Sequence, residues 1–428
     1  MAMGTDNIGV DNSAAIGEKA PEPRRDVDDA WRARASKVIP GGMYGHIQAE
    51  KFPKGYPQFF DKSDGCRVWD VDGYEYIDMM CSWGPMILGY RHPKVEEAYH
   101  KELAQRDLAY GPSPLAVELA ERYVELLDGA DWAVFAKNGG DATALATVVA
   151  RAATGRKKIL KAGSAYHGST PWYTPVLSGI TPEDRANIIF FDYNDIPSLE
   201  AAVAEAGDDL AGIIVTPHRH ELYLDQVPVD PAFAQRIRSL CDEKSAVMIL
   251  DDVRAGFRVS IHGSWSPLGI VPDLSTYSKC IANGHALSAL VGVESLKEAA
   301  SSIYATGSFW YASAPMAAGL ATLDVMEEMD AVSVMNERGN QFMEGMRKQG
   351  AAYGIPVSVT GPPAMPFLRF EDGGQNEQAF IWSGELLRRG VFVHPWHNWF
   401  VSTAHTEADI DRALEATDGA FAYLASQL

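Results

Sequence analysis

Two stretches of the chain read Val247-Met-Ile-Leu-Asp251-Asp252-Val253 and Asp273-Leu-Ser-Thr-Tyr-Ser-Lys279-Cys-Ile-Ala-Asn-Gly284. Each contains a largely apolar run that ends abruptly in a charged residue, Asp251 in the first and Lys279 in the second. Short runs of this kind, bounded by turn residues, predict buried strands. In an open parallel sheet, the residues that follow the strands gather at the carboxyl edge. The two stretches therefore predict an aspartate and a lysine at one edge of a sheet.

A lysine and a carboxylate in this arrangement match the needs of pyridoxal phosphate. The lysine forms the Schiff base, and the carboxylate keeps the pyridine nitrogen protonated so that the ring acts as an electron sink. A desolvated lysine with a lowered pKa is also a competent nucleophile toward a carbonyl group. We predict that Lys279 and Asp251 are catalytic. In an extended chain Asp252 should point the other way, and Val253 is expected to cover one face of the ring.

Helical patterns alternate with short apolar runs between about residues 130 and 292. This alternation predicts an α/β domain with a mostly parallel sheet. The candidate strands are Ala133–Ala136, Lys158–Lys161, Ile188–Phe191, Gly212–Val215, Val247–Leu250, Leu274–Tyr277 and Ala289–Val293. The candidate helices in the same region are Asp141–Ala153, Ile196–Ala206 and Pro231–Glu243. A hairpin around Asp72-Gly73 precedes this region, and a smaller helical unit follows it.

Three further segments are candidates for contact with the cofactor. Asn138-Gly139-Gly140 joins a strand to a helix, where free backbone N–H groups suit a phosphate. Tyr166, followed by His167, could stack on the pyridine ring. The hydroxyl of Ser308 could donate to the phosphate. Taken alone, a Gly-Gly turn is a weak signal for a phosphate, a tyrosine before a glycine is more often a packed residue, and a serine such as Ser308 more often marks an ordinary helix start.

Aromatic and histidine residues from both chain ends and the middle form a candidate substrate site. Core packing is the usual role of such residues. The substrate candidates are Tyr44, His46, Trp83, Phe309, Trp310 and His394. His394 and His397 lie three positions apart, but no metal-ligand spacing stands out, so we expect no metal site.

Composition narrows the class of protein. A chain of 428 residues is long enough for two domains. The formal charge of −20 argues against nucleic acid or an anionic membrane as a partner. No stretch approaches the ~18 apolar residues of a membrane span, and no signal peptide is evident. The four cysteines fit neither a zinc site nor a disulfide framework, so we expect reduced thiols in a cytoplasmic protein.

Together these residues resemble class III, fold-type I pyridoxal-phosphate aminotransferases over about residues 30–425. Ile249–Arg258 resembles the family's Asp-[Glu/Asp]-Val-x-x-Gly-Phe-Arg block. Ser278–Ala289 resembles its lysine block, and Phe400–Ile410 resembles its C-terminal signature.

The resemblance implies a large domain with a mostly parallel seven-stranded sheet flanked by helices, plus a smaller α+β domain built from the chain ends. Its expected divisions are a flexible tail at 1–26, an N-terminal segment of the small domain at 27–80, the large cofactor domain at 81–325 and the rest of the small domain at 326–428. It also implies a homodimer with shared active sites, in which Ser308 serves the neighbour's cofactor.

Within the class, Ile39–Gly42 and Cys81–Gly89 are similar to glutamate-1-semialdehyde 2,1-aminomutases. Three departures weaken that activity. Gln48 stands where those enzymes hold the substrate carboxylate with an arginine, Asn138-Gly139-Gly140 replaces Ser-Gly-Thr, and Ser308 replaces threonine.

Five other stretches resemble the aminotransferases of bacterial fumonisin catabolism. They are Pro40–His46, Phe135–Gly139, Asp251–Arg258, Thr306–Trp310 and Val393–Asn398. That resemblance implies transfer of an amino group from hydrolysed fumonisin, a long-chain amino polyol, to pyruvate. Either Arg258 or Arg91 could meet the acceptor's carboxylate.

Three alternatives stay open from the sequence. The chain could be an aminomutase, an amino-acid aminotransferase or a cofactor-binding protein without catalysis. The intact pair of Lys279 and Asp251 argues against the last.

Overall fold

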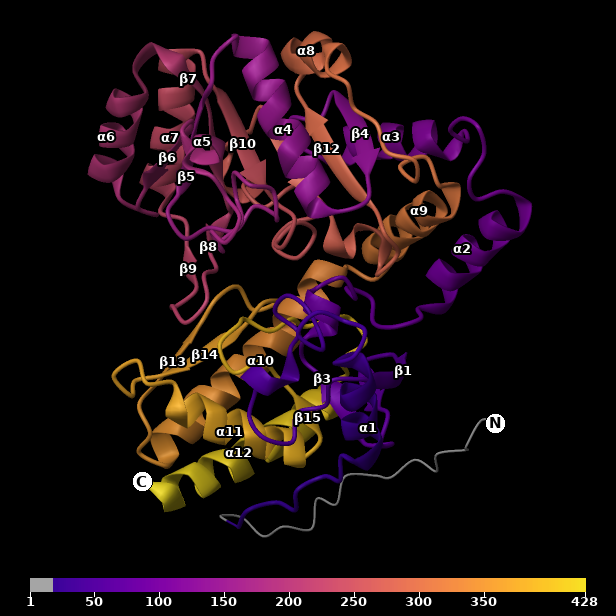
Figure 1. The fold of residues 1–428 in the computed structure, drawn as a ribbon, viewed down its shortest axis with the longest axis vertical. Helices are drawn as coiled ribbons and strands as arrows, with labels where there is room; N and C mark the ends of the chain where they lie inside the picture. The colour runs from indigo at the N-terminus through magenta and orange to yellow at the C-terminus, as the bar shows by residue number, and fades with distance from the viewer. Residues whose placement is uncertain (1–17) are drawn as a thin grey trace.

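The computed structural model describes residues 18–428, and residues 1–17 lie outside the described part. The chain forms two lobes, with the large sheet in the upper lobe and both ends of the described chain in the lower one (Figure 1). Most of the segment expected to be a tail lies outside the described residues. Its described end is packed, because the amide of Ala20 donates to Glu385 and Arg25 pairs with Asp70.

The upper lobe is built on a seven-stranded sheet with the order β4-β12-β11-β10-β7-β5-β6. Only β12 runs antiparallel to its neighbours; the other pairings are parallel. The strands are β4 (Trp132–Ala136), β5 (Lys158–Ala162), β6 (Ile188–Phe191), β7 (Leu210–Val215), β10 (Val247–Asp251), β11 (Leu274–Tyr277) and β12 (Ser288–Gly292). The sequence therefore predicted the sheet correctly, with strand ends shifted by one or two residues.

Alternating residues of the central strands face two helical layers. Val247 and Ile249 of β10 pack in the cluster that includes α4, whereas Met248 and Leu250 pack in the cluster that includes α6 and α7. The helices of this lobe are α2 (Pro93–Gln105), α3 (Leu115–Leu126), α4 (Gly139–Thr154), α5 (Pro182–Arg185), α6 (Ile196–Ala206), α7 (Pro231–Lys244), α8 (Lys297–Ser302) and α9 (Ser313–Glu328). Period-two alternation in the strand thus directs Asp251 to the same side as Ile249, toward α4.

The lower lobe joins the two chain ends in a second sheet with the order β1-β2-β3-β15. Its strands are β1 (Phe60–Asp64), β2 (Arg67–Asp70), β3 (Glu75–Asp78) and β15 (Val391–Phe392). The predicted hairpin is β2–β3, turning at Asp72-Gly73. Its helices are α1 (Asp26–Ala35), α10 (Ala331–Ala352), α11 (Glu377–Arg388) and α12 (Glu407–Gln427). Trp382 and Trp399 stack with ring centroids 5.8 Å apart inside its core.

Two small ribbons connect the lobes. The hairpin β8 (His218–Arg219) and β9 (Val227–Pro228) extends from the upper lobe toward β13 (Val357–Thr360) and β14 (Phe367–Phe370) (Figure 1). Arg369 of β14 pairs with Asp225, at 2.9 Å, and the amide of Gln226 donates to Thr360. The sequence did not predict the hairpin of β8 and β9, because strands of two residues are too short to show an alternation of apolar and polar residues.

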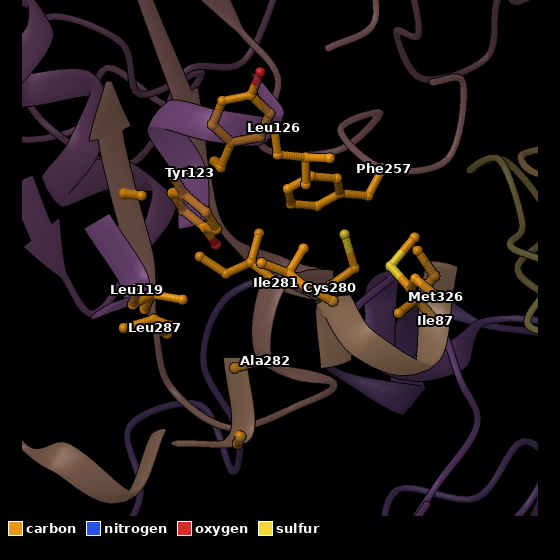
Figure 2. Close-up of a cluster of buried hydrophobic side chains, with 14 of the residues drawn as sticks. Ile87, Leu119, Tyr123, Leu126, Phe257, Cys280, Ile281, Ala282, Leu287 and Met326 are labelled. Atoms are coloured by element: carbon orange, nitrogen blue, oxygen red, sulfur yellow. The ribbon is translucent and has the colours of Figure 1, made fainter. Parts of the chain in front are cut away.

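A hydrophobic cluster supports the segment that follows Lys279. Figure 2 shows Cys280, Ile281 and Ala282 among side chains from α3, α9 and the loops, including Tyr123, Phe257 and Met326. All six of these residues are at most 2% exposed. The short 3-10 turn Lys279–Ala282 is therefore fixed by its own buried side chains, which holds the lysine in place.

Candidate active site

The ends of four strands meet around a cavity of about 560 Å³. Residues just after β4, β5 and β11, and Asp251 at the end of β10, line it. This convergence is the ordinary result of parallel strands ending at one edge of a sheet. Among the predicted residues, the cavity is lined by Asn138, Gly139, Gly140, Tyr166, His167, Asp251, Val253 and Lys279.

Asp251 lies at the floor of this first cavity and is 4% exposed. One of its oxygens accepts a hydrogen bond from Nδ1 of His167 at 2.6 Å, and the other accepts from the amide of Val253 at 3.1 Å. Burial lowers the pKa of His167, so the imidazole is neutral and donates to the carboxylate. Asp252 points the other way and binds Ser264, as its place in an extended strand predicts.

Lys279 enters the same cavity from the turn after β11. Its Nζ donates to the carbonyl oxygen of Trp83 at 2.9 Å. Burial, followed by the nearby charges of Arg254 and Arg258, lowers the pKa of Lys279 to about 7. A large fraction of the amine is therefore neutral near pH 7, which is the form that attacks a carbonyl carbon.

A left-handed turn presents the Trp83 carbonyl to this lysine. Cys81, Ser82, Trp83 and Gly84 all have positive φ angles, of 45°, 54°, 67° and 102°. Each non-glycine residue in this region costs about 1–2 kcal/mol. Phe400 closes on the turn, since a Cβ at Gly84 would lie 2.8 Å from its ring. The surrounding packing therefore holds a costly backbone at the site, as is common near active sites.

The opposite end of the first cavity is suited to a phosphate. Asn138 caps α4 with Asp141, and the first N–H groups of the helix face outward beside the positive end of its dipole. The loop after β5 closely approaches the first turn of α4 here, since a Cβ at Gly168 would lie 2.7 Å from Cα of Gly140. Nζ of Lys137 is buried here and has no hydrogen-bond partner among the described residues. An unpaired ammonium in this cradle fits the phosphate of pyridoxal phosphate.

A second cavity, of about 510 Å³, is lined in part by Trp83. Segments from both chain ends form it, and aromatic and aliphatic side chains dominate its lining. The residues Met43, Ile47, Phe52, Phe60, Trp83, Phe392 and His394 are among them. Trp83 packs edge-on against His46, His394 and His397, with ring centroids 4.3, 5.0 and 5.0 Å away. The predicted substrate residues His46, Trp83 and His394 are therefore adjacent.

Other predicted residues lie away from both cavities. Tyr44 is 69% exposed and Phe309 is 66% exposed. Ser308 and Trp310 belong to the same loop between α8 and α9, and neither lines the first or the second cavity. A role for this loop in a neighbouring subunit stays a prediction.

Neither arginine considered for the acceptor carboxylate reaches the first cavity. Arg258 is fully buried, and its guanidinium donates to the backbone carbonyls of Gly84 and Val401. Arg91 is exposed and lines neither cavity. Lys137, His220 and Arg254 are among the cavity residues that went unrecognised in the sequence. Lys137 and Arg254 stand directly beside motif residues, and that adjacency was the available signal.

Within residues 18–428, no helix has the length and apolar character needed to cross a membrane. The same part of the chain contains no group of His, Cys, Asp and Glu residues arranged to hold a metal ion.

Known proteins share this sequence and fold. The family model for class-III aminotransferases matches residues 51–417. An aminopentol aminotransferase of Sphingopyxis macrogoltabida is 45% identical, covering 91% of this chain and 92% of that protein. A glutamate-1-semialdehyde 2,1-aminomutase of Chloroflexus aurantiacus is 34% identical, covering 92% of this chain and 96% of that protein.

A solved structure extends the likeness to three dimensions. The FumI protein of Sphingopyxis sp. MTA144, in its PLP internal aldimine form, superposes with a TM-score of 0.91 at 45% identity. The match covers 92% of this chain and 95% of that one. The strand order, the lysine and aspartate at the carboxyl edge, and these relatives agree: the chain belongs to the class-III aminotransferases, which are fold-type I enzymes dependent on pyridoxal phosphate.

Proposed function

We propose that this enzyme transfers the amino group of a hydrophobic primary amine, such as a long-chain amino polyol of the hydrolysed-fumonisin type, to pyruvate. The products are a ketone and alanine. The observation that carries the donor class is the second cavity, whose apolar lining lies next to the Trp83 carbonyl that Lys279 contacts. An apolar chamber of this size suits an alkyl chain rather than a second charged group.

Different residues would have different roles in transamination. Bound pyridoxal phosphate supplies the aldehyde that takes up the amino group and a ring that withdraws electrons. Lys279 would hold the cofactor, and its Nζ, once free, would take the proton from the donor carbon that carries nitrogen and return it later in the transfer. Asp251, oriented by His167, keeps the pyridine nitrogen protonated. Val253, whose side chain packs against Gly139, would cover one face of the ring.

Two features favour this donor over glutamate semialdehyde. Gln48 takes the place of a carboxylate-binding arginine, and its amide is engaged with the backbone carbonyl of Met43. The relative at 45% identity is named for an amino polyol, whereas the aminomutase is 34% identical. We assign pyruvate as the acceptor from the same resemblance.

We further propose a homodimer with shared active sites. Large apolar side chains crowd the surface of two adjoining segments, which are tied together by the hydrogen bond from the amide of Ser313 to Asp107. Tyr110, Tyr304 and Phe309 are 110%, 93% and 66% exposed. Exposed apolar patches of this kind mark protein interfaces. A partner here would cover Phe309 and bring Ser308 to the neighbour's cofactor. We also propose that the enzyme works in the cytoplasm, in keeping with its four unpaired cysteines.

The test is alanine formation from pyruvate by the cofactor-loaded enzyme, supplied with a long-chain 2-amino alcohol. We expect alanine and ketone in equal amounts, and a higher kcat/KM than with a short amine such as 2-aminobutane. Failure to form alanine, together with turnover of glutamate semialdehyde, would replace this proposal with aminomutase activity.

A further inference from the structure

The guanidinium of Arg254 reaches the first cavity with part of its hydrogen-bonding capacity unused. Its Nη1 donates to the carbonyl oxygen of His220 at 3.0 Å and to Oδ1 of Asn398 at 2.7 Å. These two bonds use both hydrogens of Nη1. Within the described chain no acceptor contacts Nε or Nη2, and no carboxylate forms an ion pair with Arg254. One edge of the planar group is therefore available.

The groups around Arg254 leave its charge uncompensated. Burial, followed by the charge of Arg254, lowers the pKa of His220 well below its usual range and that of His218 to about 3, so both rings are neutral. Asp251 attracts Arg254, but its oxygens are taken by His167, Val253 and Thr276. Desolvation lowers the pKa of Arg254 to about 10, which still leaves it charged at neutral pH.

Partial burial destabilises a cation that has no ion-pair partner, and a negatively charged ligand would offset this destabilisation. The free Nε and Nη2 hydrogens lie in one plane, which matches the two oxygens of a carboxylate. Arg254 also lines the same cavity as Lys279 and lowers the pKa of that lysine through its charge. A carboxylate bound at Arg254 would therefore lie beside the reacting groups.

We propose that the Nε–Nη2 edge of Arg254 binds the carboxylate of the keto-acid acceptor and selects acceptors with a carboxylate next to the carbonyl group. The inference rests on the proposed function, because it assigns the subsite for the second half of that reaction. A donor without a carboxylate makes no use of this edge. The two cavities thus serve two unlike substrates: the apolar chain of the donor occupies the second, and the small anion binds at Arg254 in the first.

The experiment compares two acceptors in single turnovers of enzyme already charged with the amino group. Pyruvate carries the carboxylate, and propanal is an uncharged carbonyl compound. Arg254→Gln should lower the ratio of the rate constants for pyruvate and propanal by about 10- to 100-fold, the range expected for loss of hydrogen bonds to a charged group. Arg254→Lys, which keeps the charge but not the planar edge, should recover part of the ratio. An unchanged ratio in Arg254→Gln would overturn the proposal.

A binding measurement separates this inference from the proposed function. Oxamate is an unreactive isostere of pyruvate, and calorimetry gives its affinity without turnover. We expect Arg254→Gln to weaken oxamate binding by the same 10- to 100-fold factor. Asn398→Ala removes an acceptor of Arg254 but keeps the cation, so it should shift oxamate affinity less than about threefold, the scale of one neutral contact. Equal affinity in the wild type and Arg254→Gln would overturn the subsite even if alanine is formed. A wild type that forms no alanine yet needs Arg254 for oxamate would reject pyruvate transamination and keep the anion site.

Discussion

The cavity that Lys279 lines and the cavity that Trp83 lines are similar in volume, about 560 and 510 Å³, but different in construction. The first is formed at strand ends and holds charged groups: Asp251 and Lys279 are bound by specific partners, whereas Nζ of Lys137 has none among the described residues. The second is formed by the chain ends and holds aromatic rings that pack on one another. Three charged residues, Asp61, Lys62 and Asp78, also line it, and Asp78 accepts a hydrogen bond from the hydroxyl of Tyr90 at 2.7 Å. The comparison indicates that the sheet positions the reacting groups at its strand ends. Selection of the donor depends instead on the cavity that the two chain ends form.

The strongest test of this division removes the lysine of the first cavity. Lys279→Ala should lower turnover of every amine by at least about a thousandfold, because one group both holds the cofactor and moves the proton. The measurement is alanine formation with a long and a short amine in parallel. Lys158→Ala, in the sheet but outside the cavity, is the matched control. Residual activity that depended on the length of the amine would contradict this division of roles between the two cavities.

A second test alters only the apolar cavity. Ser63→Trp or Ile47→Trp should fill part of it and lower the ratio of kcat/KM for a twelve-carbon 2-amino alcohol to that for 2-aminobutane by about tenfold. Two positions are used so that one poorly folded variant does not decide the result. Ser301→Trp on the exposed surface of α8 serves as the control. If both amines lost activity equally, the second cavity would not be the donor site.

A third test examines the phosphate end of the first cavity. Lys137→Met removes the unpaired ammonium and should weaken binding of pyridoxal phosphate by about tenfold. Equilibrium dialysis against the free cofactor measures this directly. Lys94→Met, which breaks a surface ion pair with Glu328, should leave the affinity as it is. Unchanged affinity in Lys137→Met would leave the helix N-terminus as the main phosphate contact.

The smallest expected effect is a pH dependence of the cofactor-free protein. The pKa of Lys279 is about 7 in the fold, against 10.5 for the free side chain, so between these values the unfolded chain binds more protons. Stability from this group therefore rises from pH 7 to pH 10. Lys279→Met removes the effect, and should melt on the order of a few degrees above the wild type at pH 7. The gap should close by pH 10; a constant gap would mean that packing, not charge, causes it.

The sequence predicted the first cavity far better than the second. Asp251 and Lys279 each follow a strand whose apolar run is visible in the chain, so their positions depend on local pattern and on the geometry of parallel strands. The direction of the Asp252 side chain, opposite to that of Asp251, was also predictable from the alternation of side chains along one strand. Asn138 and the glycines after it were predictable for the same reason, since the strand-to-helix turn is local.

Residues whose role depends on distant segments were harder to predict. Trp83 and His394 were chosen only as members of an aromatic set, and their contact joins positions far apart in the chain. Arg258 was a candidate for binding the acceptor carboxylate because it ends a motif. In the fold it is buried against the ring of Phe400. The sequence assigned no role to Arg254. Only the tertiary structure shows that it lines the same cavity as Lys279 and that no carboxylate of the described chain forms an ion pair with it.

The sequence by itself determined the order of strands and helices, the lysine, the aspartate and the family they belong to. These features reside in short runs whose period and end residues are read directly. Only the tertiary structure decided which cations face the cavity, how the left-handed turn at Cys81–Gly84 presents a carbonyl to Lys279, and where an apolar chamber opens. The physical reason is that burial and the pairing of charges are properties of segments brought together, and no single segment carries them.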